Sequence, residues 1–128
     1  MTRSTLALVT AAVVIAIGGA RTTAQHAFGT PRTIIHVSLI KWKAGVSDTD
    51  KKKALDGVRA MAGKIPGMRN VWTKAIRLQP EGYQDAFVIE FENQAAADRY
   101  AKDPAHDAWT EAFLAIREAS ISPQITNE

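Results

Sequence analysis

The chain has 128 residues, of which 16 are Lys or Arg, 13 are Asp or Glu and none is cysteine. Two of the basic residues, Arg3 and Arg21, lie in an N-terminal segment without acidic residues, so the rest of the chain has 14 basic and 13 acidic residues and a charge of +1. This balance gives no electrostatic reason to expect nucleic acid or an anionic membrane as a partner. The lack of cysteine excludes disulfides, a thiol nucleophile and a thiolate metal site.

The first 24 residues have the three parts of a secretory signal peptide. Arg3 precedes an apolar run from Leu6 to Ile17, and the small residues Thr22–Ala24 form a cleavage region. The run is shorter than the about 20 apolar residues of a membrane-spanning helix, so an uncleaved anchor is the minor alternative. Cleavage after Ala20 is a second possibility. We therefore expect an exported protein, periplasmic or secreted, without stable membrane insertion after residues 1–24 are removed.

The remaining chain is short enough to be a single domain. Residues 25–32 contain Gly29 and Pro31 and indicate a short flexible lead. We expect the domain to span residues 33–126.

The first expected strand, residues 33–43, is largely apolar on both faces. Ile35, Val37 and Leu39 alternate with a second row of side chains. That second row consists of Ile34, His36, Ser38, Ile40 and Trp42. An antiparallel sheet with one solvated face has one polar row, so this pattern indicates that both faces are covered. We expect helices on one face and a second copy of the chain on the other; a monomer with an exposed apolar sheet is the alternative.

A helix and two further strands are expected next. Ser47 is suited to cap the helix, with Asp50 three residues on, and Gly63 marks its end. Residues 68–78 are expected to form the second strand, residues 79–82 a turn, and residues 85–92, with period-two alternation, the third strand.

The sequence pattern predicts two helices and a strand in the C-terminal third of the domain. Asn93 is suited to cap a short helix that turns Tyr100 inward, and Asp103-Pro104 to begin a second helix. The inward stripe of that second helix is His106, Trp109, Phe113 and Ile116. The last strand is expected at residues 120–126, where Pro123 removes a ladder donor and so favours an edge position, a bulge or a short strand.

Several short sequence motifs, taken together, resemble one known family. They are TIIHVSLIKWK at residues 33–43, KIPGM at 64–68, and the strand end EFEN followed by DPAH in the stretch 82–109. In this order and spacing the chain resembles the stress-responsive A/B barrel (Dabb) family. The resemblance implies an α+β, ferredoxin-like β-α-β-β-α-β domain with a four-stranded antiparallel sheet, helices on one face, and pairing of two sheets as a dimeric α/β barrel.

The resemblance also implies a candidate site. His36, Tyr100 and His106 match the strand histidine, the helix tyrosine and the PAH histidine of polyketide cyclases in this family, where the PAH histidine is the general base. The three side chains meet only if the row of His36 faces the helices, which the pattern alone leaves open. Val58 stands where those cyclases have a second pocket tyrosine. We expect Ser38, Trp109 and Val58 as further ligand contacts.

The position of His106 in a first helical turn supports a role as a base. The partial positive charge of a helix N-terminus disfavours a charged imidazole, so the ring stays neutral near pH 7. A nearby His36 could then hydrogen-bond to the ring and fix its tautomer, and Tyr100 could donate to a carbonyl or enolate oxygen. The simpler alternative is that these three side chains satisfy one another in the core.

Two functions therefore remain open from the sequence. One is an exported module that binds a small apolar or aromatic ligand without turnover. The other is a cofactor-free, polyketide-cyclase-like lyase with His106 as general base, and cofactor-independent monooxygenation is its weaker enzymatic variant. No cofactor is expected, and no metal either, because two histidines without a suitably spaced carboxylate make an incomplete site.

Overall fold

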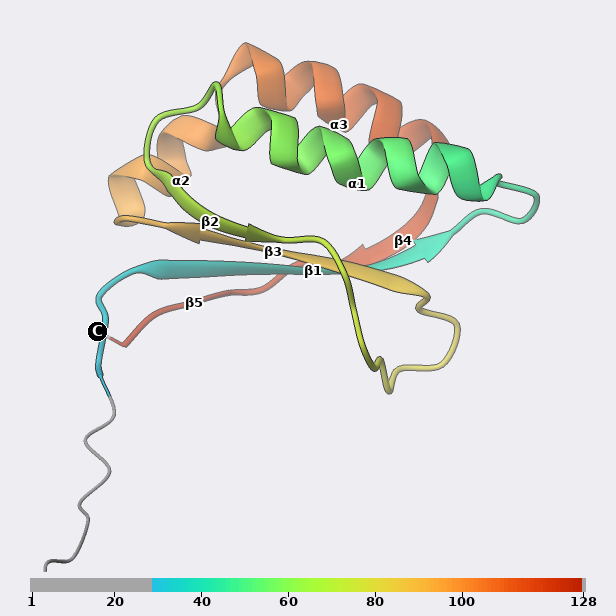
Figure 1. The fold of residues 1–128 in the computed structure, drawn as a ribbon, viewed down its shortest axis with the longest axis horizontal. Coiled ribbons are helices and arrows are strands. Elements are labelled where there is room, and N and C mark those ends of the chain that lie inside the picture. Colours follow the sequence, from blue (N-terminus) through green and yellow to red (C-terminus); the bar gives the residue numbers. More distant parts are fainter. Residues whose placement is uncertain (1–28, 128) are drawn as a thin grey trace, which may run out of the picture.

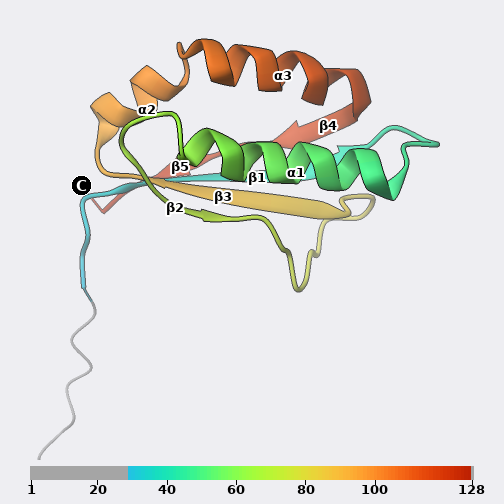
Figure 2. The same ribbon diagram turned by 45° about the horizontal axis from the view of Figure 1, so that its top comes forward.

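A computed structural model describes residues 29–127. In this part of the chain an antiparallel sheet carries all its helices on one face, as Figures 1 and 2 show. The elements are β1 (Ile34–Trp42), α1 (Asp48–Ala62), β2 (Met68–Trp72), β3 (Asp85–Phe91), α2 (Gln94–Tyr100), α3 (Pro104–Ile116), β4 (Arg117–Ile121) and β5 (Gln124–Ile125). The predicted α+β, ferredoxin-like architecture is confirmed. The predicted signal segment 1–24 and residues 25–28 of the lead lie outside the described residues.

The strand order is β2-β3-β1-β4, and β5 also pairs with β1. β4 and β5 occupy the same edge in succession, since Leu39 pairs with Ile121 and Ile35 with Ile125. Pro123 separates them and accepts a hydrogen bond from the Val37 amide with its carbonyl. The expected four-stranded sheet therefore has a short fifth strand that continues β4.

β1 settles which row of the first strand faces the helices. Ile34, Ser38 and Ile40 are buried beneath the helices, and His36 shares their row. Ile35, Val37 and Leu39, which form the other row, are half-buried on the open face of the sheet. The core between sheet and helices is completed by Val58, Met61, Ile65, Phe87, Ile89, Phe91, Ala96, Ala97, Tyr100 and Phe113.

The helices begin where the sequence predicts. Ser47, Asn93 and Asp103 each accept a backbone N–H with the side chain at the start of α1, α2 and α3. Pro104 is the first residue of α3, where its missing N–H has no helical partner to lose. α3 then passes directly into β4 at Arg117. Within residues 29–127 no helix has the length and apolar character needed to cross a bilayer.

α1 and α3 approach closely at Gly57. A Cβ on Gly57 would lie 2.6 Å from Cδ1 of Trp109, so a larger residue could not stand there without a shift of the indole. Trp109 also donates from Nε1 to the Ala54 carbonyl at 2.8 Å. The glycine thus allows the indole to lie against α1 and fixes how α3 sits above the sheet.

Two strand boundaries differ from the sequence prediction. The second strand ends at Trp72 rather than Leu78, and the chain then leaves the sheet as a loop on the side away from the helices (Figures 1 and 2). The last strand begins at Arg117 rather than Ser120, because α3 continues into it without a loop. An alternating pattern shows which way side chains point, but it does not show how far a strand stays paired with its neighbour.

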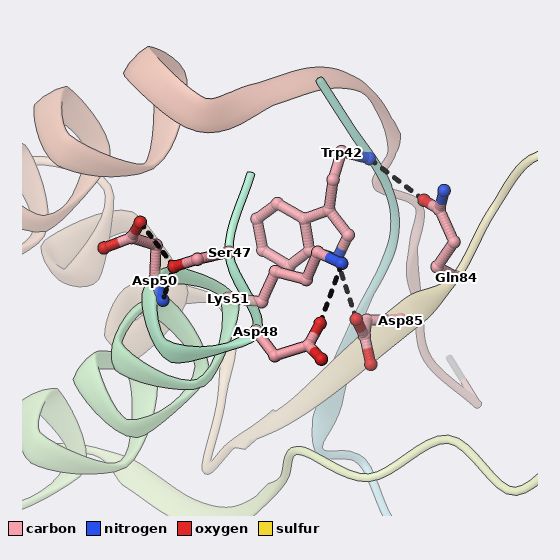
Figure 3. Close-up of polar contacts among 7 residues, drawn as sticks. All are labelled: Trp42, Ser47, Asp48, Asp50, Lys51, Gln84 and Asp85. Carbon is pink, nitrogen blue, oxygen red and sulfur yellow. Dashed lines mark hydrogen bonds and ion pairs between the residues drawn. The ribbon is translucent and has the colours of Figure 1, made fainter. Parts of the chain in front are cut away.

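Trp42 joins the end of β1 to the start of β3. Its indole Nε1 donates to Asp85 Oδ2 at 2.7 Å and its amide to Gln84 Oε1 at 3.1 Å (Figure 3). Its ring is 3% exposed and meets Phe113 edge-on, with ring centroids 5.8 Å apart. Trp42 is therefore a core residue, whereas Trp72 is 51% exposed on its edge strand.

Candidate functional site

A cavity of about 210 Å³ lies between α3 and the sheet. Its floor comes from β1, β3 and β4, and its roof from α3 with Tyr100 of α2. Five of the residues singled out from the sequence line it: His36, Ser38, Tyr100, His106 and Trp109. The sixth, Val58, does not; it is fully buried in the core on α1.

Tyr100 lies between the two histidines. Its ring centroid is 4.2 Å from that of His106 and 6.3 Å from that of His36. Within residues 29–127 no hydrogen bond links the two imidazoles, so the direct contact considered from the sequence is not formed. His36 Nδ1 instead meets Gln124 Nε2 at 3.4 Å, and His106 Nε2 meets Thr110 Oγ1 at 3.2 Å.

Burial sets the ionisation of these groups. It lowers the pKa of His36, and the nearby His106 lowers it further. Burial also lowers the pKa of His106, against an opposing effect of Asp107 and Asp103. Both rings are therefore neutral at pH 7. Burial raises the pKa of Tyr100 well above its ordinary value, so the phenol keeps its proton and can act as a donor.

The two nitrogens of His106 differ in their partners. Nδ1 is buried and has no hydrogen-bond partner in the described part of the chain, whereas Nε2 contacts the hydroxyl of Thr110, which lines the cavity. Since Nδ1 is buried, Nε2 beside Thr110 is the better candidate for proton exchange with a molecule in the cavity. Thr110 follows His106 by four residues, a spacing at which side chains on a helix meet. The contact between Thr110 and His106 could therefore have been predicted from the sequence.

Aromatic rings form one wall of the cavity. Phe87 meets Trp109 edge-on with centroids 5.6 Å apart, and Trp109 stacks on Phe113 at 4.6 Å. The far side of this wall borders a larger hollow of about 340 Å³ between α1 and α3. That hollow is lined mainly by Ala54, Gly57, Ala112 and Ile116, with Asp50 and Lys53, and by no histidine or tyrosine. The groups suited to chemistry gather in the smaller cavity.

The opposite end of the cavity is polar, and no motif of the sequence indicated it. Arg117, Ser120 and Ser122 of the β4 region line it beside Ser38. Ser38 and Ser122 are hydrogen-bonded through their hydroxyls at 3.0 Å. The alternation of Ser120 and Ser122 could have shown that both face inward. The expected strand began at Ser120, however, and so left Arg117 outside it. In residues 29–127 no group of three or more His, Asp or Glu side chains is arranged to hold a metal ion.

The fold and the site define a class: a ferredoxin-like domain with an open pocket between sheet and helices. A family model described as the stress responsive A/B barrel domain (Dabb) matches residues 34–124. The chain belongs to this family. No curated protein matches the chain significantly.

Solved structures with this fold carry several functions. A hydroxynitrile lyase from Passiflora edulis shares 15% identity with a TM-score of 0.67, over 74% of this chain and 93% of that one. A cofactor-independent oxygenase from Streptomyces nogalater shares 13% identity with a TM-score of 0.62, over 74% and 92%. A dimeric ferredoxin-like protein of unknown function from Thermobifida fusca shares 18% identity with a TM-score of 0.64, over 73% and 90%. At these identities the likeness shows the fold.

Proposed function

We propose that this protein binds a small aromatic or apolar molecule in the cavity between α3 and the sheet. The proposal rests on one observation: aromatic and polar side chains line the same cavity. His36, Tyr100 and His106 lie at one end of it, and Phe87 and Trp109 form its side wall. Concave sites with apolar walls and a few placed polar groups are typical of small-molecule binding. The cavity volume of about 210 Å³ suits a compact ligand.

The first test is a calorimetric titration with 3-phenylpropanamide, a neutral compound with an aromatic ring and an amide. We expect the wild type to bind it and His106→Ala to bind it more weakly, since a wall of the cavity is removed. Glu111→Ala, an exposed change on the same helix, is the matched control and should bind as the wild type does. Thermal melting of all three proteins shows whether the fold is kept. No binding to the wild type, together with a large fall in melting temperature for His106→Ala, would show that the histidine is only a core residue.

A second candidate function is a cofactor-free lyase, favoured by the neutral His106 beside a protonated Tyr100. In such a reaction His106 takes a proton from a carbon next to a carbonyl group, and Tyr100 donates a hydrogen bond to the enolate oxygen. The enolate carbon then bonds to a second carbonyl carbon, and the imidazolium returns its proton to the alkoxide formed. The named lyase and oxygenase with this fold show that it accommodates catalysis, and their activities are not carried over to this chain.

Proton abstraction can be tested without knowing the substrate. 4-Phenylbutan-2-one in D₂O exchanges the hydrogens next to its carbonyl only slowly by itself. Wild-type protein is expected to accelerate deuterium incorporation at those carbons, and His106→Ala to lose the acceleration while Glu111→Ala keeps it. Equal exchange rates with the wild type and with His106→Ala would leave binding as the function.

We further propose that two copies associate through their open sheet faces. On the open face, Val88 of β3 pairs with Val37 of β1 on one side and with Trp72 of β2 on the other. Leu39 and Ile121 form a further pair beside them. An apolar patch of this kind is unusual on a monomer. The dimeric description of the T. fusca protein supports the same arrangement. Sedimentation at micromolar concentration should give the mass of a dimer.

Export remains a proposal that rests on the sequence of residues 1–24. If the segment is a cleaved signal, the exported protein should lack about the first 20 to 24 residues. Intact-mass spectrometry of protein recovered outside the cytoplasm measures this directly. Retention of Met1 in that fraction would contradict cleavage.

A further inference from the structure

The end of the cavity away from His106 contains a guanidinium group. Arg117 is half-buried and lines the cavity together with Ser38, Ser120 and Ser122. Its Nη1 donates to Ser120 Oγ, and its Cζ lies 5.7 Å from the centroid of the Phe113 ring. These two contacts hold the charged head over the cavity rather than out in solvent.

The usual structural roles of such an arginine are filled by other residues. The C-terminal carbonyls of α3 are capped by Lys43, whose Nζ donates to the Ala115 carbonyl at 2.8 Å and whose amide donates to the Ile116 carbonyl at 3.0 Å. The neighbouring carboxylate, Glu118, pairs with Lys41 at 2.7 Å. Within residues 29–127 no carboxylate forms an ion pair with Arg117.

The guanidinium of Arg117 is also not fully hydrogen-bonded. Arg117 Nε is buried and has no hydrogen-bond partner in the described part of the chain. A buried donor without a partner destabilises a fold, and more so when it is part of a charged group. Because Nε is buried, a ligand in the cavity would meet the guanidinium at its Nη groups, beside the bond from Nη1 to Ser120 Oγ. An acceptor oxygen on the ligand suits this unpaired cation, and a carboxylate suits it best.

We propose that the ligand of this cavity is a small aromatic or apolar carboxylic acid, bound with its carboxylate at Arg117 and the serine hydroxyls. The inference rests on the proposed ligand-binding function and adds the chemical class. Arg117 follows His106 by 11 residues on one helix and its continuation, roughly 16 Å at 1.5 Å per residue. The His106 ring contacts Thr110 and the Arg117 head lies over Phe113, so both side chains lie along this span. The carboxylate therefore binds at one end, the aromatic wall holds the body of the ligand, and its other end meets Tyr100 and His106.

The test compares an acid with its neutral isostere. 3-Phenylpropionate and 3-phenylpropanamide have the same shape and differ in charge. Titrated into wild-type protein at pH 7, the acid is expected to bind at least about tenfold more tightly, the effect of one charge-assisted pair. In Arg117→Gln the ratio should fall to about one while the amide affinity stays the same.

Two further variants keep the result interpretable. Arg59→Gln removes an exposed arginine on α1 and should retain the preference for the acid. Arg117→Lys keeps the charge without the fork and should retain part of it. Equal binding of acid and amide to the wild type would overturn the carboxylate proposal and leave the cavity as a neutral site. A preference retained in Arg117→Gln would overturn the role of Arg117. Binding of neither compound would overturn both this inference and the ligand-binding function.

Discussion

At the scale of single residues, the site depends on Tyr100. Its ring lies against both imidazoles, and it is 4% exposed. No hydrogen bond joins its hydroxyl to another group in residues 29–127, and burial alone raises its pKa. The phenol thus keeps its proton, and Tyr100 lines the cavity beside two neutral rings.

The hydroxyl of Tyr100 should matter for binding more than for stability. Because it lacks a protein partner, Tyr100→Phe removes no hydrogen bond, and we expect the free energy of unfolding to change by less than about 1 kcal/mol. Affinity for 4-phenylbutan-2-one, whose carbonyl can accept from the phenol, should fall. Chemical denaturation and calorimetric titration measure the two effects. A large loss of stability with unchanged affinity would contradict this role.

The two histidines make stability depend on pH. Both have a pKa in the folded state below the ordinary value of about 6.5, so between the folded and unfolded values the unfolded chain binds more protons. Stability is therefore level above about pH 6.5 and falls as the pH drops below it. Melting temperatures measured from pH 7.5 to pH 5.5 should show this decline.

The control for the pH effect is the double variant His36→Gln with His106→Gln. It should lose most of the decline in that range, because neither group then takes up a proton on unfolding. NMR titration of the ring protons should find His36 and His106 of the wild type half-protonated below pH 6.5. An undiminished decline in the double variant would assign the effect to other groups.

At the scale of elements, the sequence predicts much of this fold because its signals are local. The caps at Ser47, Asn93 and Asp103 and the alternation of β1 each depend on a few neighbouring residues, and all were identified correctly. The end of β2 and the start of β4 depend on how far one strand pairs with another. That is a long-range property, which a period of two does not contain.

The same distinction between local and long-range signals applies to the residues of the site. His36, Tyr100 and His106 could be named from the sequence through family resemblance, and the structure brings them to one cavity. Arg117 could not, because its place depends on α3 passing into β4 without a loop. Val58 is buried in the core and does not line this cavity. A match to a position in a relative indicates where the backbone lies, but it does not show whether the valine side chain reaches the cavity.

The contact between α1 and α3 can be tested at Gly57. Alanine raises helix propensity by up to about 1 kcal/mol, but its Cβ would overlap the Trp109 indole, and overpacking of this kind costs about 1–3 kcal/mol. Gly57→Ala should therefore lower the melting temperature. It should also shift the fluorescence emission of Trp109, because the hydrogen bond from the indole Nε1 to the Ala54 carbonyl is strained or broken.

Gly63→Ala is the matched control. Gly63 ends α1 with a φ of −79°, and the nearest atom to an added Cβ is 3.7 Å away. This variant should be as stable as the wild type or slightly more stable. If Gly57→Ala is equally stable, the close approach of the helices is not what positions Trp109.

At the scale of the whole molecule, one face of the sheet is covered by helices and the other is open. Trp72 is 51% exposed, Ile121 45% and Ile125 57%, although all three are large apolar side chains on strands. The register places Ile125 beside Ile35, and Ile121 beside Leu39. The open face thus has a band of apolar side chains from β2 to the β4–β5 edge, with the polar residues Glu90 and Lys41 beside it.

A charge in the middle of this surface should prevent association. Val37→Glu would place a carboxylate there twice in a symmetric dimer, and we expect the dissociation constant to rise at least about 100-fold. Ala60→Glu, on the exposed side of α1, should leave the mass in sedimentation unchanged. A dimer that persists in Val37→Glu would show that a different surface is used.

β1 separates the cavity from the open face by the thickness of one strand. His36 points to the first and Val37 to the second, and they are joined by a single peptide unit. A ligand that shifts β1 would alter the affinity of one copy for another. Thermodynamic linkage then requires the reverse: by whatever factor occupancy tightens association, association tightens occupancy by the same factor. The measured affinity of the cavity would then depend on protein concentration, and titrations at nanomolar and at micromolar protein would give different constants.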